Sequence, residues 1–431
     1  MSRSTLGVFG ALLGMALLTG CDTGAAGTAR AQGGDFACAP DDGGLVLPDG
    51  FCAVVVADDV GNARHMAVAP NGDLYVTLRG GRGTPGGAIA LRDTTGDGVA
   101  DQRVAFDDVG GTGIELWNGW VYVGHDDGVV RYRRPEGQLR PEAGAEVIVQ
   151  GLRARGGHAA KPVEISPEGD LFLNIGSPSN SCQVDDRAAG SPGEDPCEER
   201  ETNAAIWRFD AEATGQTLAD GERVAAGMRN TVALHYDEGD GALYAAIHGR
   251  DQLHQNWEEH YTPEESAELP AEEFVRVSDG DDYGWPYCYY DHVQGKKVLA
   301  PEYGGTGDEV GRCADMDDPL VGFPGHWGPN DLLFYHGDLF PDRYRDGVFI
   351  AFHGSWNRAP LPQEGANVVF LPRENGGFAA ERWEVFAEGR ENWAETREHR
   401  PTGLAEGPDG SLYISDDAGG RIWRVVYRPE G

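Results

Sequence analysis

Six segments of the chain share one pattern of polar and apolar positions. Each has a turn with glycine beside an apolar run that holds an aromatic residue: PNGDLYVTL at Pro70, LWNGWVYVG at Leu116, PEGDLFLNI at Pro167, EGDGALYAA at Glu238, YRDGVFIAF at Tyr344 and PDGSLYISD at Pro408. Short apolar runs bounded by turn residues predict paired β-strands. Because each unit can bury its apolar face only against a neighbour, the pattern predicts six repeated blades.

The spacing of these units favours a ring of blades over a sandwich. The intervals run from about fifty to roughly a hundred residues, so there is no strict repeat. The longest interval, from Leu243 to Phe349, is expected to carry inserted loops. The 64 glycines and 25 prolines are typical of many short elements joined by tight turns. The predicted fold class is all-β, a six-bladed β-propeller, whose closure removes sheet edges and whose ligands bind at one end of the central channel.

The first residues differ from the rest of the chain. After one arginine, an uncharged apolar stretch runs from Leu6 to Leu18, and the residues up to Cys21 resemble a bacterial lipoprotein cleavage box. Residues 1–20 are therefore predicted to be a lipoprotein signal peptide, with Cys21 lipidated. An ordinary secretory signal or a short membrane anchor is the alternative. The prediction is a protein exported and lipid-anchored at the bacterial cell envelope, on the periplasmic side.

The composition then changes twice. Residues 22 to 44 are small and polar, which predicts a flexible tether over residues 21–44. From Leu45 onward the composition is even, so residues 45–431 are expected to form one propeller domain.

The cysteines agree with export. Seven occur, and setting aside Cys21 leaves six, an even number that suits disulfides in an oxidising compartment. Free thiols or a metal site are the alternatives, and the absence of any C-x-x-C-H motif excludes covalent haem. Nearness in sequence suggests these pairs: Cys38 with Cys52, Cys182 with Cys197, and Cys288 with Cys313.

The charge limits the partners. The formal net charge of −36 disfavours nucleic acid and anionic membrane surfaces. Solubility or adaptation to salt accounts for the acidity most simply. An anionic ligand is expected to bind only where the fold gathers its arginines, because lysine occurs only at Lys161, Lys296 and Lys297.

The polar loops follow an order that identifies a family. A G-H pair precedes a P-x-G hairpin near His158, and G-x-R-N, G-R-D, Y-G-W-P and H-G-S-W-N-R follow in that order. Together they resemble the quinoprotein glucose/sorbosone dehydrogenase family, from Leu45 to Tyr427. The resemblance implies a six-bladed propeller that uses pyrroloquinoline quinone (PQQ) and calcium to oxidise an aldose or related sugar or alcohol. Electrons would pass to an external acceptor, a quinone or a cytochrome.

The resemblance implies two catalytic residues. His158 occupies the position of the general base, where a neutral imidazole takes the hydroxyl proton as hydride leaves the carbon. Arg229 would stabilise the negative charge that arises on the quinone oxygen, and Asn230 would hold the carbonyl edge of the cofactor. The alternatives are a structural hydrogen bond for His158 and a turn cap for the Arg229-Asn230 pair.

The three carboxylates of the cofactor call for several cations. By resemblance we expect Arg358 and Arg400 to bind them, with Lys161 and Arg250 as further contributors. Trp356 or Trp285 is expected to cover the planar cofactor, although a buried tryptophan in a propeller is more often part of the core.

Two segments are candidates for calcium. In the family, main-chain carbonyls at a strand end hold the ion, and the matching segment here is His248 to Asp251, which gives Gly249, Arg250 and Asp251 as metal residues. The second is DTTGDGVAD, where Asp93, Thr95, Asp97, the Val99 carbonyl and Asp101 follow EF-type spacing around Gly98. It lacks the glutamate at the twelfth position, so a plain acidic turn is an equal alternative.

Two departures from the best-known glucose dehydrogenase bear on the substrate. Gly157 stands before the base in place of an acid, and Ser177 stands where that enzyme has an aspartate. Glucose specificity is therefore not supported, and the branch with sorbosone and aldose dehydrogenases is more similar. Two other functions stay open: a calcium-dependent lactonase or esterase propeller, and a non-catalytic binding propeller of the envelope.

Overall fold

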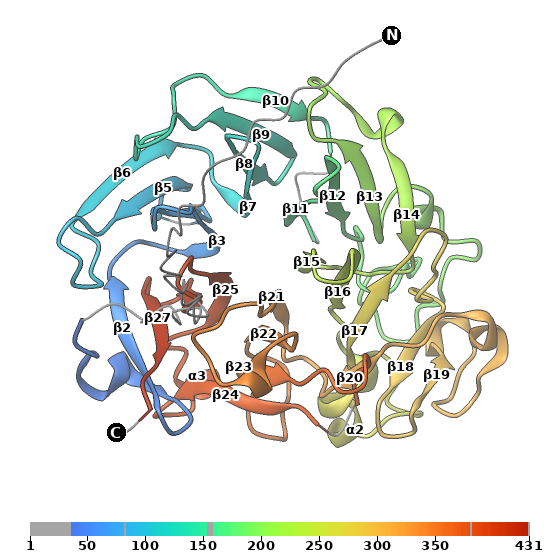
Figure 1. The fold of residues 1–431 in the computed structure, drawn as a ribbon. Helices are drawn as coiled ribbons and strands as arrows, with labels where there is room; N and C mark the ends of the chain where they lie inside the picture. The colour runs from blue at the N-terminus through green and yellow to red at the C-terminus, as the bar shows by residue number, and fades with distance from the viewer. Residues whose placement is uncertain (1–35, 82, 153–157, 380–381, 430–431) are drawn as a thin grey trace, which may run out of the picture. The chain divides into compact units, whose positions relative to one another are not determined.

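The computed structural model describes residues 36–81, 83–152, 158–379 and 382–429. Six antiparallel sheets are arranged as blades around a ring (Figure 1), and a seventh sheet in the described residues has only two strands. The six-bladed β-propeller predicted from the sequence is confirmed. Each of the six predicted units lies at the hairpin between the first two strands of one blade.

The strands of the blades follow the chain. The first three blades are β3 (Ala63–Val68), β4 (Leu74–Leu78), β5 (Gly87–Arg92) and β6 (Gln102–Asp107); β7 (Gly111–Trp117), β8 (Trp120–His125), β9 (Gly128–Arg133) and β10 (Glu146–Val149); and β11 (Val163–Ile165), β12 (Asp170–Ile175), β13 (Ala205–Asp210) and β14 (Glu222–Ala226). The fourth has β15 (Ala233–Asp237), β16 (Ala242–Ile247), β17 (Glu272–Val277) and β20 (Val321–Phe323). The fifth has β21 (Pro329–Phe334), β22 (Val348–His353), β23 (Ala366–Leu371), β24 (Glu384–Gly389) and β1 (Leu45–Val46), and the sixth β25 (Pro401–Glu406), β26 (Leu412–Asp416), β27 (Ile422–Tyr427) and β2 (Phe51–Ala57).

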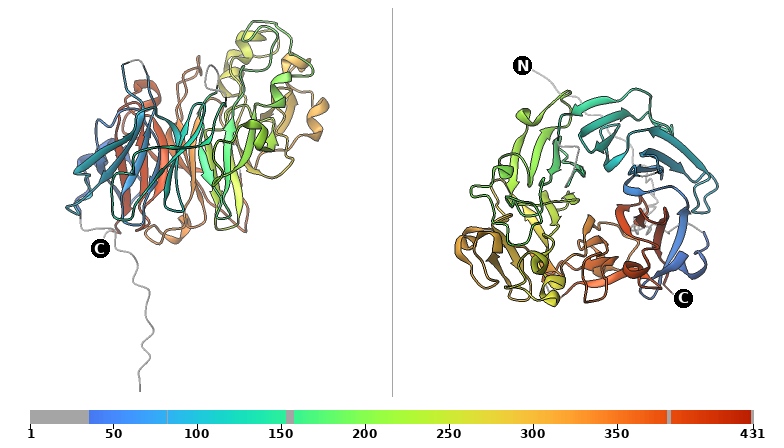
Figure 2. Two further views of the ribbon diagram at one scale, coloured as in Figure 1. Left: turned by 90° about the horizontal axis from the view of Figure 1, so that it is seen from above. Right: turned by 180° about the vertical axis from the view of Figure 1, so that it is seen from behind.

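The expected insertion lies in the fourth blade. Between β16 and β20 the chain adds α1 (Leu253–Asn256), α2 (Pro263–Glu268) and the hairpin of β18 (Cys288–Asp291) and β19 (Lys296–Leu299). Figure 2 shows these loops rising above one face of the ring. The remaining helix is α3 (Trp393–Thr396), and short 3-10 turns span Pro40–Gly44, Glu198–Glu201, Leu218–Asp220, Pro301–Tyr303, Gly311–Asp315 and Asp342–Tyr344.

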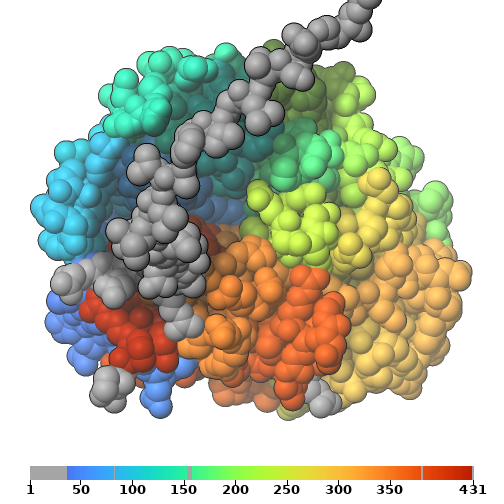
Figure 3. Space-filling model, in the orientation of Figure 1, coloured from blue at the N-terminus to red at the C-terminus, as the bar shows by residue number. Residues whose placement is uncertain are grey.

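The ring is closed by strands from the two ends of the described chain. β2 pairs with β27, so that Phe51 lies opposite Tyr427. In the space-filling view the blades follow one another around the ring until the last meets the first (Figure 3). The neighbouring strands and blades cover the second strand of a hairpin on both faces, and all residues of β4 and β16 are buried. This explains why the second strand of each hairpin is a nearly continuous apolar run.

All three predicted disulfides are present. Cys38 is bonded to Cys52, Cys182 to Cys197 and Cys288 to Cys313. The last two pairs pack in one buried cluster with Trp285 and Tyr287, and so fasten the inserted loops. A cross-link of this kind stabilises mainly by restricting the unfolded chain.

The last part of the expected tether belongs to the propeller. Phe36 is buried, and the amide of Ala39 donates to the carbonyl of Ala53 at 2.8 Å. The Cys38–Cys52 bridge fixes the same segment to β2. Small, polar residues therefore do not mark a free linker over residues 36–44, because a disulfide and one phenylalanine hold them. The predicted signal peptide and Cys21 lie outside the described residues.

Across the described ranges, no helix is both long and apolar enough to cross a membrane.

Candidate functional site

A cavity of ≈ 250 Å³ lies where the loops that lead into the innermost strands meet. It collects polar side chains from loops that the sequence singled out. Its lining residues are His158, Arg229, His248, Gly249, Asp251, Glu272, His326, Gly328, Asn330, His353, Gly354, Trp356, Asn357 and Arg400. The predicted base and two of the predicted cofactor arginines therefore share one cavity.

His158 is held in one tautomer by Ser177. Its Nδ1 lies 3.0 Å from the Ser177 carbonyl and 3.0 Å from the Ser177 hydroxyl, whose own hydrogen goes to the carbonyl of Ser179. Nδ1 therefore donates, and Nε2 carries the lone pair. Burial, followed by the charge of Arg229, lowers the pKa of His158 well below its usual value. The imidazole is neutral at physiological pH and suited to accept a proton.

Gly176 lets the imidazole approach this closely. A Cβ atom built on Gly176 would lie 2.5 Å from the Cβ of His158 and 2.6 Å from its carbonyl oxygen. Any larger residue would push His158 away from Ser177.

Arg229 is buried and fixed by four hydrogen bonds. Its Nε and Nη2 donate to the carbonyl and the side-chain oxygen of Asn180 at 3.1 and 2.9 Å. Its Nη1 donates to the carbonyl of Gly249 at 2.8 Å, and Nη2 also reaches Asp251 Oδ2 at 3.1 Å. Burial lowers the pKa of Arg229, and the Asp251 carboxylate opposes that shift. A guanidinium ordered in this way stabilises nearby negative charge without reorganising.

Asn230 supports the site from behind the cavity wall. Its Oδ1 accepts from Asn174 at 3.2 Å, and its Nδ2 lies 3.4 Å from His248 Nδ1. It is not among the residues that line the cavity. The structure places it as a support for His248 rather than as a direct contact of the cofactor's carbonyl edge.

Arg400 and Trp356 lie at the same cavity. Arg400 donates to the carbonyls of His353 and Gly354 at 2.7 and 2.5 Å, which orients its guanidinium. Trp356 is 57% exposed, so it is no core residue and suits a cover. Trp285, the alternative cover, is buried and donates to the carbonyl of Asn180 at 2.9 Å.

Besides Asn230, three predicted cofactor cations do not line the cavity. Arg358 is buried and donates to the carbonyls of Ala267 and Gly325 and to two glutamates. Arg250 is buried in an ion pair with Glu302 at 2.5 Å, and the ammonium of Lys161 donates to the carbonyl of Ala159 at 2.6 Å. These cations serve internal partners, so the structure does not support a cofactor contact for any of them.

Loss of Arg358 is expected to affect stability without affecting the cavity. We expect Arg358→Met to lower the free energy of unfolding by about 3 kcal/mol, because it leaves buried carbonyls and Glu268 without their donor. Denaturant unfolding of the variant measures the loss. Unchanged stability would show that these contacts are too solvated to matter.

The predicted calcium residues at the strand end already have protein partners. The Gly249 carbonyl accepts from Arg229, and the Asp251 carbonyl accepts from Asn180 at 2.9 Å and Arg250 at 3.2 Å. A cation at Gly249 would also face the guanidinium of Arg229. In the part of the chain that the structure describes, no three His, Cys, Asp or Glu side chains are grouped to hold a metal. The donor set does not fit a calcium ion here.

The Asp93–Asp101 loop fits the alternative of an acidic turn. Asp93 accepts from the amides of Thr95, Gly96 and Gly98 at 2.7 to 3.0 Å. Asp97 accepts from the amide of Val99, and Asp101 from the amide and hydroxyl of Thr94. The carboxylates therefore cap their own loop.

Glu272 is a cavity residue that the sequence did not reveal. Its carboxyl accepts from the amides of Gly249 and Gly328 at 3.0 and 3.2 Å. Burial raises its pKa to about 8, so it is mostly protonated at neutral pH. It opens a strand with no motif around it, and no local signal distinguishes it.

Asn357 is a second missed residue. Its Nδ2 donates to Asp251 Oδ1 at 2.9 Å, while its buried Oδ1 has no hydrogen-bond partner within the described ranges. A buried orphan acceptor that lines a cavity indicates a place for a ligand donor.

The chain matches the family model described as TrAA12-like over residues 45–428. Among curated proteins, it is 25% identical over 254 residues to a pyrroloquinoline quinone-dependent pyranose dehydrogenase of Coprinopsis cinerea, which covers 49% of this chain and 32% of that protein. It is 27% identical over 208 residues to an uncharacterized protein of Borreliella burgdorferi, and the match covers 48% of this chain and 49% of that protein. The chain thus spans half or less of the length of these curated relatives.

Solved structures share the fold. The holo form of the PQQ domain of the Coprinopsis cinerea pyranose dehydrogenase superposes with a TM-score of 0.71 at 19% identity, covering 89% of this chain and 97% of that one. The calcium structure of a Trichoderma reesei carbohydrate-active enzyme of family AA12 superposes with a TM-score of 0.72 at 17% sequence identity. The superposition covers 93% of this chain and 99% of that one. At these low sequence identities, the structural similarity shows that the chains share the propeller fold.

Proposed function

The chain belongs to the TrAA12-like family, and from this premise we propose that it is a PQQ-dependent dehydrogenase that oxidises an aldose or a related sugar or alcohol. The observation that carries the proposal is the meeting of His158, Arg229 and Arg400 in one cavity of a strongly acidic protein. The named activity of the pyranose dehydrogenase relative supports the same reaction class.

The cavity fits a planar polyanion. Arg229 and Arg400 supply fixed positive charge, and the buried Oδ1 of Asn357 lacks a donor within the described residues. The rim carries Trp356, whose exposed ring can lie over a flat molecule. Protonation of Glu272 removes one negative charge that would repel carboxylates.

In the proposed mechanism, PQQ when bound supplies the hydride acceptor. His158 Nε2 takes the proton of the substrate hydroxyl, because Ser177 keeps the hydrogen on Nδ1. Arg229 stabilises negative charge in the cavity, and its four hydrogen bonds keep it from turning away. Since the calcium donor set does not fit, no step is assigned to a metal.

The setting of the reaction is part of the proposal. We place the protein at the bacterial envelope with a lipid on Cys21, where a quinone or a cytochrome would accept the electrons. The three disulfides support an oxidising compartment.

Reconstitution tests the function. Purified protein is mixed with PQQ, with and without calcium chloride, and dye reduction is followed over a panel of aldoses. We expect a bound-quinone spectrum and sugar-dependent dye reduction. A protein without either would be a binding propeller, and lactone hydrolysis without quinone would make it a lactonase.

Replacing Ser177 tests the base by its pH dependence. In the present chain the low pKa of His158 places the acid limb of kcat/KM below pH 6.5, since the base works only above its own pKa. Ser177→Asp adds a carboxylate that stabilises the imidazolium, so the limb should move to higher pH. Ser177→Ala, which keeps the backbone carbonyl, is the control. An unmoved limb in the aspartate variant would contradict the role of Ser177.

A further inference from the structure

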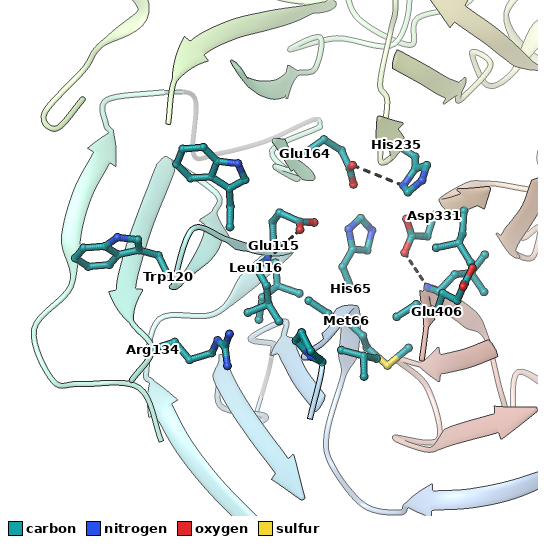
Figure 4. A pocket seen from close by; sticks show the side chains of 18 of the residues that line it. His65, Met66, Glu115, Leu116, Trp120, Arg134, Glu164, His235, Asp331 and Glu406 are labelled. Atoms are coloured by element: carbon teal, nitrogen blue, oxygen red, sulfur yellow. Dashed lines mark hydrogen bonds and ion pairs between the residues drawn. The ribbon is translucent and has the colours of Figure 1, made fainter. Parts of the chain in front are cut away.

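A second and larger cavity, of ≈ 450 Å³, lies at the other ends of the innermost strands (Figure 4). β21 borders both cavities: Asn330 lines the first, and Asp331 to Leu333 line the second. Arg400 precedes β25 in the first cavity, and Glu406 ends β25 in the second. The two cavities therefore occupy opposite ends of the central channel.

Five titratable side chains form a ring in this cavity, one from the innermost strand of each of five successive blades. They are His65 of β3, Glu115 of β7, Glu164 of β11, His235 of β15 and Asp331 of β21. Figure 4 shows them pointing toward one another. We call this set the acid–histidine ring.

The three acids of the ring have no lysine or arginine partner among the described residues. Glu115 accepts from the amide of Leu116, and Asp331 accepts from two backbone amides. Glu164 accepts from a backbone amide and lies 3.6 Å from His235 Nδ1. Among the described residues, no lysine or arginine forms an ion pair with any of them.

The two histidines add acceptors and no charge. His65 is only 6% exposed, and its Nε2 donates to the carbonyl of Asn330 at 2.7 Å. Its Nδ1 therefore carries a lone pair, and no partner for it exists in the described ranges. Burial lowers the pKa of His65 to about 3 and that of His235 to about 4, so both are neutral.

Ionising these buried acids costs free energy when no cation lies near them. Burial raises the pKa of Glu115 to about 7 and raises the pKa values of Glu164 and Asp331 well above their usual range. The charge of Glu115 adds to the shift of Glu164. These shifts keep Glu164 and Asp331 mostly protonated at neutral pH while the cavity is empty. A ligand that is both a cation and a hydrogen-bond donor would favour their ionised form, in which the carboxylates accept its hydrogen bonds.

The remaining wall defines the rest of the ligand. Away from the ring, the cavity is lined mainly by apolar and aromatic side chains, including Met66, Leu116, Trp117, Trp120 and Leu333. Three polar residues, Asn118, Arg134 and Glu406, also line this wall. The ring is too open for direct metal coordination, because the described chain has no group of three ligating side chains. An ammonium ion needs only donor distances of about 2.8 Å, longer than metal bonds, and tryptophan faces attract cations.

We propose that this cavity binds a primary organic ammonium ion, with the ammonium group in the acid–histidine ring and an apolar body against Leu116 and Trp117. The proposal is independent of the dehydrogenase function.

Isothermal titration calorimetry on the full chain tests it, with 2-phenylethylammonium chloride as the probe and 2-phenylethanol and calcium chloride alone as comparisons. We expect saturable binding of the amine, and at least about tenfold weaker binding of the alcohol, because one charged hydrogen bond is worth that factor. Glu164→Gln and Glu115→Gln should each weaken amine binding about tenfold. The exposed Glu136→Gln is the matched control and should bind as the unmodified protein does.

Circular dichroism confirms the fold of each variant. If Glu164→Gln does not fold, Glu115→Gln is the decisive variant. Within the described ranges, the Glu115 carboxylate accepts a hydrogen bond from the amide of Leu116 alone, so its loss disturbs few contacts. Equal binding of the alcohol, equal binding by Glu115→Gln, or no amine binding at all would overturn the proposal. Calcium binding that displaces the amine would identify a metal site instead.

Discussion

His158→Ala is expected to abolish most turnover while the quinone stays bound. Without a group that takes the hydroxyl proton, kcat should fall by about 10²–10⁴-fold. Arg229 and Arg400 remain in place, so the affinity for PQQ should change little. Steady-state dye reduction measures the rate, and the spectrum of the bound quinone measures occupancy.

A second histidine serves as the control. His260 lies outside the cavity, in the inserted loops near Glu259, so His260→Ala should keep full activity. A rate for His158→Ala within about threefold of the unmodified protein would exclude general-base catalysis by this residue.

Arg229→Gln is expected to remove cofactor binding. The substitution takes away the best-ordered cation of the cavity and leaves Asp251 with less compensation, so the affinity for PQQ should fall at least about a hundredfold. Breaking a buried pair also costs stability, about 3 kcal/mol. A spectral titration with PQQ and denaturant unfolding separate the two effects.

The control variant must remove one arginine charge at a position outside the cavity. Arg343 is mostly exposed and pairs with Glu384, so Arg343→Gln should leave both affinity and stability unchanged. Full quinone affinity in a folded Arg229→Gln would contradict the placement of the cofactor.

The architecture was predictable because it depends on local signals. Each inner hairpin has its own turn and apolar run, and each predicted disulfide joins cysteines close in sequence. The segment around Phe36 was assigned to the tether because its polarity resembles a linker. The predicted Cys38–Cys52 bridge already indicated that it is held to β2.

The site was predictable only in part. The motifs in their loops made His158, Arg229 and Arg400 candidates, and the structure brings them to one cavity. A motif does not reveal the partner of a guanidinium. Arg358 pairs with Glu268 and Arg250 with Glu302, which lie 90 and 52 positions away. Such pairing is decided by tertiary contact.

Residues without a motif were missed for the same reason. The acid–histidine ring takes single residues from five innermost strands, and only the closure of the propeller brings them together. Within one strand, Glu115 or Asp331 reads as an ordinary polar position.

The central claim is that PQQ lies between Arg229 and Arg400 within reach of His158. A crystal structure of the protein with PQQ tests it most directly. The account predicts quinone density in this cavity, with carboxylates on the guanidinium groups and His158 Nε2 facing the open side where a sugar hydroxyl would enter. Quinone density elsewhere on the propeller, with this cavity filled only by water, would contradict it.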